Sequence, residues 1–151
     1  MKMHDTTTIE KKTMVTEPST VAPRSTERMT YVVVTPAYNE QTSLPMTVKS
    51  MVAQTHKPQI WVIVDDGSSD DTWSIIAAAS RANPWIVGLR REKKAAAGTD
   101  GLLVASEAAA FLEGCQLATS RFPEAGCIVK LDADLQFRSD YFAGLLVEFL
   151  G

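Results

Sequence analysis

The stretch Val129-Lys130-Leu131-Asp132-Ala133-Asp134 decides the fold, because an apolar run here ends in two carboxylates one residue apart. In extended backbone the side chains alternate between faces, so Asp132 and Asp134 point the same way about 6.6 Å apart, and Ala133 points the other way. Mg²⁺ prefers one or two carboxylates plus phosphate oxygens to a cage made of protein alone. The pair therefore indicates a divalent-cation site. An isolated acidic pair at a strand end is, however, about as often a plain turn or cap.

Strand-like and helix-like segments alternate around this stretch. The β-branched run Tyr31-Val32-Val33-Val34-Thr35 is stopped by Pro36, and similar short apolar runs follow. This order is typical of an α/β protein with a mostly parallel sheet and helices on both faces. We expect strands at 31–35, 60–64, 85–89 and 127–131. We expect helices at 71–82, at 102–119, from 140 onward, and after a cap at Ser43 or Thr42 with Pro45 in the first turn.

Polar side chains follow three of the predicted strands. Tyr38 comes after the first strand, Asp65 and Asp66 after the second, and Asp132 and Asp134 after the fourth. In an open α/β sheet, ligands bind beyond the carboxyl ends of the strands, so we expect these side chains to share one edge. The chain has neither a Gly-x-Gly-x-x-Gly nor a Walker loop. A metal held by carboxylates is then the simplest means of holding a phosphate.

Length and composition restrict the class of protein. The 151 residues predict one domain, and the net charge of −3 without a Lys/Arg stripe argues against nucleic acid as a partner. Cys115 and Cys127 are not in a Cys-x-x-Cys arrangement and are expected to be buried free thiols. No apolar run reaches the roughly 18 residues of a membrane span, and no signal-peptide pattern is present. These features predict that the protein is located in the cytoplasm, either free or at the cytoplasmic face of a membrane.

The amino-terminal residues differ in composition from the rest of the chain. Residues 1–29 are rich in Thr, Ser, Lys, Glu and Pro without apolar periodicity, which predicts a disordered polar tail. The folded domain is expected at 30–151.

Three segments together resemble a known family. Val-Val-Thr-Pro-Ala-Tyr-Asn-Glu (33–40), Val-Asp-Asp-Gly-Ser-Ser-Asp-Asp-Thr (64–72) and Leu-Asp-Ala-Asp (131–134) look like the nucleotide-sugar half of family 2 glycosyltransferases. These enzymes have the Rossmann-like GT-A fold of nucleotide-diphospho-sugar transferases. The resemblance covers about residues 30 to 150. It implies a metal-dependent enzyme that moves a sugar from a UDP- or GDP-linked donor to an acceptor hydroxyl.

The resemblance also implies roles for particular residues. The loop with Pro36, Tyr38 and Glu40 would lie against the nucleoside. Asp66, with Asp65 beside it, would read the base. Asp134 would ligate Mg²⁺ or Mn²⁺, and Asp132, the other carboxylate of the metal motif, would contact the ribose or the sugar.

The chain departs from the family pattern at two places. Between the third strand and the Asp-x-Asp motif, Arg91, Lys93 and Lys94 form either a diphosphate contact or a solvated basic turn. The acceptor half, which holds the general base of inverting members, has no counterpart here, so the catalytic base is expected beyond Gly151 and the domain is interpreted as truncated.

Two alternatives to an active transferase remain open. One is a nucleotide-binding or nucleotide-sugar-binding fragment without turnover. The other is a phosphotransferase like the haloacid dehalogenases, with Asp132 as nucleophile and Asp134 as acid/base. Against the latter, Gln136 stands where Thr or Val is usual, and three strands precede the motif.

Overall fold

The computed structural model describes residues 29–92 and 100–150, and the side chains of 29–92 and 105–149. The predicted tail, apart from Met29, lies outside the described residues, as do Lys93 and Lys94. Met29 packs against the hydrophobic core just before the first strand.

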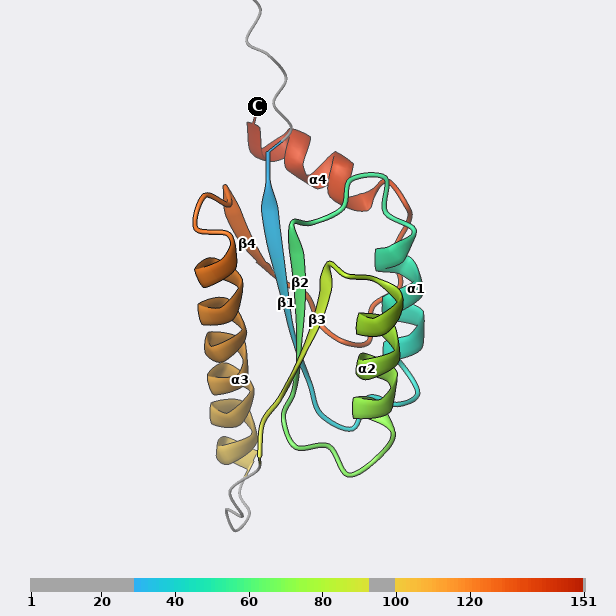
Figure 1. Cartoon of the computed structure of the whole chain (residues 1–151), viewed down its shortest axis with the longest axis vertical. Helices are drawn as coiled ribbons and strands as arrows, with labels where there is room; N and C mark the ends of the chain where they lie inside the picture. Colours follow the sequence, from blue (N-terminus) through green and yellow to red (C-terminus); the bar gives the residue numbers. More distant parts are fainter. Residues whose placement is uncertain (1–28, 93–99, 151) are drawn as a thin grey trace, which may run out of the picture.

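Strands and helices alternate along the chain, as expected (Figure 1). All three strand pairings are parallel, and the sheet order is β3-β2-β1-β4. This confirms the predicted α/β class with a parallel sheet. The elements are β1 (Tyr31–Ala37), α1 (Leu44–Val52), β2 (Ile60–Asp65), α2 (Thr72–Ala82), β3 (Ile86–Arg90), α3 (Asp100–Arg121), β4 (Cys127–Lys130) and α4 (Tyr141–Leu150).

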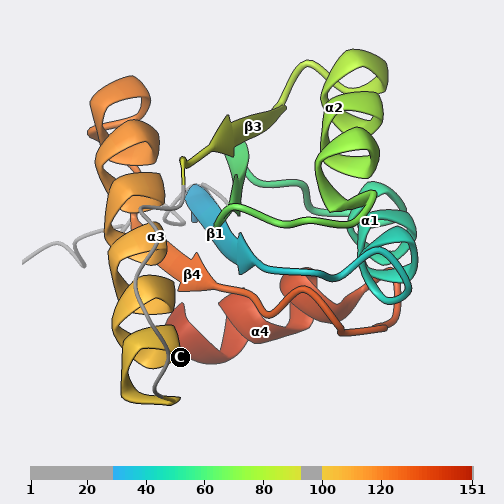
Figure 2. The ribbon, with the colours of Figure 1, turned by 90° about the horizontal axis from the view of Figure 1, so that it is seen from below.

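The sheet separates two layers of helices (Figure 2). On one face, Tyr31 and Val33 of β1 pack with residues of α1, α2 and α4. On the other face, Val32 and Val34 pack with α3. Because both faces of β1 and β2 are buried, their residues form continuous apolar runs rather than an alternating pattern.

The first strand continues through Pro36 to Ala37, so the prediction that Pro36 stops it is wrong. Val34 accepts a hydrogen bond from Leu131 on the β4 side, whereas Ala37 accepts one from Asp66 on the β2 side. By this alternation the nitrogen of Pro36 faces the β4 side, at a level where β4 has already ended at Lys130. Its missing N–H therefore costs no ladder bond.

The starts of α1, which was predicted to be capped by Ser43 or Thr42, and of α2 differ in detail. Ser43 occupies the N-cap position of α1, but its hydroxyl donates to Glu40 Oε2 at 2.7 Å and caps no helical N–H. At α2, Asp70 Oδ1 accepts the backbone N–H of Thr72 at 3.0 Å and so performs the capping from one residue earlier than the formal N-cap.

The two cysteines are free thiols, as predicted, although each is only partly buried. Burial raises the pKa of both thiols above the ordinary value. None of the helices in the described part of the chain is both long and apolar enough to cross a bilayer.

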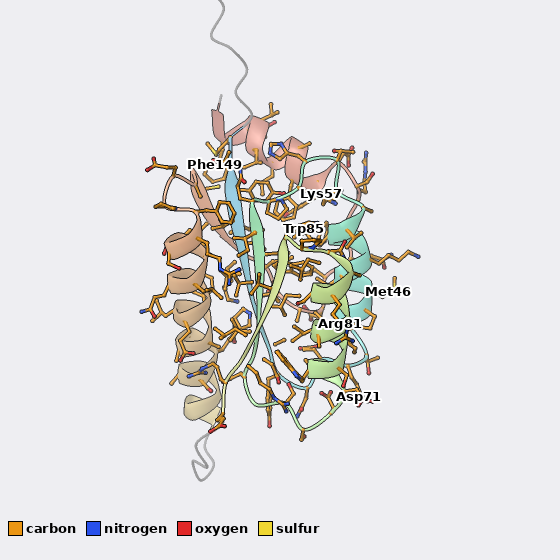
Figure 3. All side chains as sticks on the ribbon, viewed as in Figure 1. Met46, Lys57, Asp71, Arg81, Trp85 and Phe149 are labelled. Carbon is orange, nitrogen blue, oxygen red and sulfur yellow. The ribbon has the colours of Figure 1, made fainter. Side chains whose placement is uncertain are left out.

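The carboxyl ends of β1, β2 and β3 point toward the lower edge in Figure 1, and β4, which runs parallel to β1, ends at a higher level. The loops that follow β1 and β2 turn back at this edge. Figure 3 shows Asp71 at the same end of the molecule, whereas Lys57 and Phe149 lie toward the opposite end. The fold thus gathers the loops after β1 and β2 at one edge of the sheet.

Two helical glycines should respond oppositely to alanine. A Cβ at Gly114 of α3 would lie 2.4 Å from Val34 Cγ1, whereas a Cβ at Gly144 of α4 would meet no atom within 4 Å. Alanine favours a helix by about 1 kcal/mol over glycine, but overpacking costs about 1–3 kcal/mol. We expect Gly114→Ala to lower the free energy of unfolding and Gly144→Ala to raise it, as measured by urea denaturation. Equal gains at both sites would contradict the close approach of α3 to the sheet.

Candidate functional site

A cavity of about 450 Å³ opens at the carboxyl edge of the sheet. Its walls come from the end of β1 and the loop after it, the residue that follows β2, helix α3 and the segment that begins in β4. Of the described residues that were predicted to bind the donor or the metal, Asp65 and Arg91 do not line it. The lining residues are Pro36, Ala37, Tyr38, Glu40, Asp66, Glu107, Lys130, Asp132, Ala133 and Asp134.

The Asp-x-Asp motif keeps the alternation of a strand although β4 ends at Lys130. Leu131 and Ala133 are buried, whereas Asp132 and Asp134 are exposed. Oδ1 of Asp132 accepts a hydrogen bond from Lys130 Nζ at 2.7 Å. Within the described residues, the carboxylate of Asp134 has no hydrogen bond or ion pair. Of the two carboxylates of the motif, that of Asp134 is therefore the one left unpaired within the described residues.

Asp66 follows β2 and is held from three sides. Its backbone N–H donates to the carbonyl of Ala37 at 2.9 Å, and its carboxylate accepts hydrogen bonds from the guanidinium of Arg91 and the hydroxyl of Ser106. A carboxylate has about four acceptor positions, so these two bonds leave about two of them for further donors. Asp66 is only 6% exposed, yet it reaches the cavity wall.

Arg91 is engaged inside the protein. Besides Asp66, its guanidinium contacts Glu113 Oε1 at 3.0 Å and the carbonyl of Ser106 at 3.1 Å. Neither of the two interpretations from sequence, a diphosphate contact or a solvated basic turn, anticipated this pairing.

Asp65 points into the loop interior. It is fully buried, and Oδ1 accepts the backbone N–H of Ser68 at 3.0 Å. Its Oδ2 lies 3.4 Å from Arg90 Nε, an ion-pair contact rather than a hydrogen bond. Asp65 thus shapes the acidic loop instead of lining the cavity.

The loops after β1 and β2 are joined through Asn39. This residue has a left-handed backbone (φ 54°), its N–H donates to Ser68 Oγ at 2.9 Å, and its Oδ1 accepts the N–H of Ser69 at 2.9 Å. The next N–H, of Glu40, donates to Thr72 Oγ1 at 2.8 Å. These bonds hold the segment with Tyr38 and Glu40 against the acidic loop.

Replacing Asn39 should weaken this junction. Asn39→Ala removes the acceptor for Ser69 and places a β-carbon in the left-handed region, so we expect a loss of about 1–2 kcal/mol in the free energy of unfolding. Asn39→Gly tolerates the backbone conformation and should lose less. Urea denaturation of both variants measures the difference. Equal stability of the alanine variant and the wild type would contradict the structural role of Asn39.

Two charged lining residues, Glu107 and Lys130, were not predicted from the sequence. Lys130 Nζ donates to Asp132 and lies 2.8 Å from Glu107 Oε1. Its hydrogen bonds to Asp132 and then to Glu107 raise the pKa of the Lys130 ammonium above its usual value. The alternation that predicts Asp132 and Asp134 on one face also places Lys130 there, so this signal was available. Glu107 lies on a helix, distant in sequence from the Asp-x-Asp motif, and no sequence pattern predicted its place at the cavity.

The cavity wall is strongly acidic. Among its described lining residues, five are acidic (Glu40, Asp66, Glu107, Asp132, Asp134) and one, Lys130, is basic. No cluster of three His, Cys, Asp or Glu side chains suited to a metal occurs in the described ranges. This donor set fits Mg²⁺ or Mn²⁺ held by one or two carboxylates and completed by oxygens of a bound phosphate.

Comparison with known proteins agrees with the motifs. The sequence model of Glycosyl transferase family 2 matches residues 32–150. Similar folds occur in TarS 1–349 from S. aureus (TM-score 0.59, 20% identity, 79% of this chain and 32% of that one). Another is the mannosyltransferase PcManGT from Pyrobaculum calidifontis, solved with GDP-Man and Mn²⁺ (TM-score 0.52, 24% identity, 84% and 34%).

A third similar structure is glucosyl-3-phosphoglycerate synthase from Mycobacterium tuberculosis, solved with Mn²⁺, UDP and glucosyl-3-phosphoglycerate (TM-score 0.53, 19% identity, 81% and 40%). The chain thus spans about a third of the length of these structures. The family match covers most of the chain and includes all three motifs. The chain belongs to glycosyl transferase family 2, and its described part has the architecture of the amino-terminal portion of the GT-A fold.

Proposed function

We propose that this chain forms the donor-binding portion of a metal-dependent glycosyltransferase. The donor would be a UDP- or GDP-linked sugar, and the acceptor a hydroxyl group of a molecule that the site does not identify. One observation carries the proposal: the cavity joins the Asp-x-Asp carboxylates to Tyr38 and Asp66 at the carboxyl edge of a parallel sheet. Structures of similar fold were solved with UDP-GlcNAc, GDP-Man and UDP.

The residues around the cavity divide into two groups in this proposal. Pro36 and Tyr38 form a wall for the nucleoside, and Asp66 accepts an N–H of the base through its remaining lone pairs. The junction through Asn39 keeps this wall in place.

At the other side of the cavity, Asp134 holds Mg²⁺ or Mn²⁺, and Asp132 contributes to the metal or contacts the ribose or sugar. The metal, when bound, acts as a Lewis acid that stabilises the charge of the departing diphosphate. The acidic wall explains the need for it, because a diphosphate would otherwise meet carboxylates.

Binding of the nucleotide or nucleotide sugar without turnover is the second candidate. The chain spans about a third of the solved structures of similar fold. Deprotonating an acceptor hydroxyl needs a base within hydrogen-bond reach, and we propose that this base lies beyond Gly151. A phosphotransferase of the haloacid dehalogenase type has no support from the family match. The cytoplasmic location stays a prediction.

An assay of nucleotide release separates transfer from binding. The chain is incubated with a panel of UDP- and GDP-sugars and Mn²⁺, with and without candidate acceptor alcohols. We expect slow, acceptor-independent release at most, because water needs no acceptor pocket. Acceptor-dependent turnover on the order of 1 per second or more would show that a catalytic base lies within these 151 residues.

A further inference from the structure

We propose that the Lys130 ammonium is the protein's own cation for the donor diphosphate and donates a hydrogen bond to a phosphate oxygen. This inference rests on the proposed function and adds a residue to the same site. Lys130 lines the same cavity as Asp132 and Asp134.

The geometry leaves one donor of Lys130 available. An ammonium has three N–H donors. One is directed to Asp132 Oδ1 at 2.7 Å and one to Glu107 Oε1 at 2.8 Å. Two carboxylates on separate elements, one on α3 and one after β4, therefore fix the position of Nζ. The third N–H has no partner among the described residues, and the Lys130 side chain that carries it lines the cavity.

Other cations near the site are engaged elsewhere. Arg91 is paired with Asp66 and Glu113, and Arg90 lies over the Trp73 ring, with its Cζ 5.5 Å from the ring centroid. Within the described lining of the cavity, Lys130 is the single positive group. A diphosphate that enters this acidic cavity gains most from a contact with Lys130.

The two neighbouring carboxylates also restrain the lysine. A surface lysine loses side-chain entropy when it binds a phosphate, but here the paired carboxylates have already ordered the side chain. A charge-assisted hydrogen bond contributes about 1.5–3 kcal/mol, so loss of Lys130 should weaken diphosphate binding about tenfold or more.

The test is an NMR titration of the isotope-labelled chain with UDP and with GDP in EDTA, so that no metal contributes. It compares the wild type, Lys130→Met, the double variant Lys130→Met/Asp132→Asn, and the control Lys57→Met. Lys57 has the same charge but lies toward the opposite end of the molecule (Figure 3). Lys130 is 41% exposed at its side chain, so methionine should leave the fold intact, which the amide spectrum verifies.

The expected result is that Lys130→Met weakens nucleotide binding about tenfold or more and that Lys57→Met leaves it unchanged. The double variant has the same net charge in the cavity as the wild type, and it should remain as weak as Lys130→Met. If the double variant regains wild-type affinity, Lys130 only neutralises Asp132 and the proposal is wrong. Unchanged affinity in Lys130→Met overturns it too.

A failure of the proposed function has a different signature. If the wild type binds UDP or GDP with Mn²⁺ but neither nucleotide in EDTA, the inference about Lys130 fails and the proposed function stands. If the wild type binds neither nucleotide even with Mn²⁺, the donor site itself is wrong and the inference falls with it.

Discussion

Asp134→Asn should abolish the Mn²⁺-dependent binding of UDP or GDP and leave the melting temperature unchanged. The Asp134 side chain is exposed and has no partner within the described residues, so its loss should not disturb the fold, and in the proposed site its carboxylate is the one that holds the cation. An amide is a much weaker ligand for a hard divalent cation than a carboxylate. Loss of outer partners of metal ligands already costs about 10–100-fold in affinity, and we expect at least that loss here.

Calorimetric titration with nucleotide, in Mn²⁺ and in EDTA, measures this effect. Asp140→Asn is the matched control, because Asp140 is also exposed and pairs only with Arg138 among the described residues. Its loop lies beside Thr55, at the far end of α1 from the cavity. The wild type and the control should bind more tightly in Mn²⁺ than in EDTA, and Asp134→Asn should not. Equal Mn²⁺-dependent affinity in all three proteins would rule out Asp134 as a metal ligand.

Arg91→Met should give the largest loss of stability among the charge substitutions. It removes the cation that pairs with nearly buried Asp66 and leaves the Ser106 hydroxyl as the main remaining partner. Breaking a buried ion pair from one side costs about 3–5 kcal/mol, because an uncompensated charge stays in the protein. The side chain of Arg91 is 20% exposed, so we expect the lower end, about 3 kcal/mol.

Urea denaturation tests this expectation with two further variants. The double variant Asp66→Asn/Arg91→Met removes the unpaired charge and should recover part of the loss. Arg138→Met breaks the exposed pair with Asp140 and should cost less than about 1 kcal/mol. If Arg91→Met is as mild as Arg138→Met, the contact between Arg91 and Asp66 is not a structural ion pair.

Local patterns were sufficient to predict most of the fold. The two central strands are buried on both faces, and their unbroken apolar runs marked them to within two residues at either end. The parallel order then placed the loops after β1, β2 and β4 at one edge, which is where the cavity lies. Strand alternation correctly gave the common direction of Asp132 and Asp134.

Long-range contacts account for what the sequence did not reveal. The hydrogen bond from Ser106 to Asp66 joins residues 40 apart in the chain, and no local sequence pattern predicts such a pair. The side chain of Asp65 is held inside the loop by Ser68 and Arg90. Two adjacent residues of the same type, Asp65 and Asp66, therefore have different environments. Glu107 reaches the cavity only because α3 packs across β1 and β2.

The most direct measurement of the donor site is a crystal structure of this chain with UDP or GDP and Mn²⁺. We predict electron density for Mn²⁺ at Asp134, a diphosphate between that ion and Lys130, and the nucleoside against Tyr38 with its base at Asp66. A nucleotide bound elsewhere on the chain, or a metal bound away from the Asp-x-Asp motif, would contradict the assignment of this cavity as the donor site.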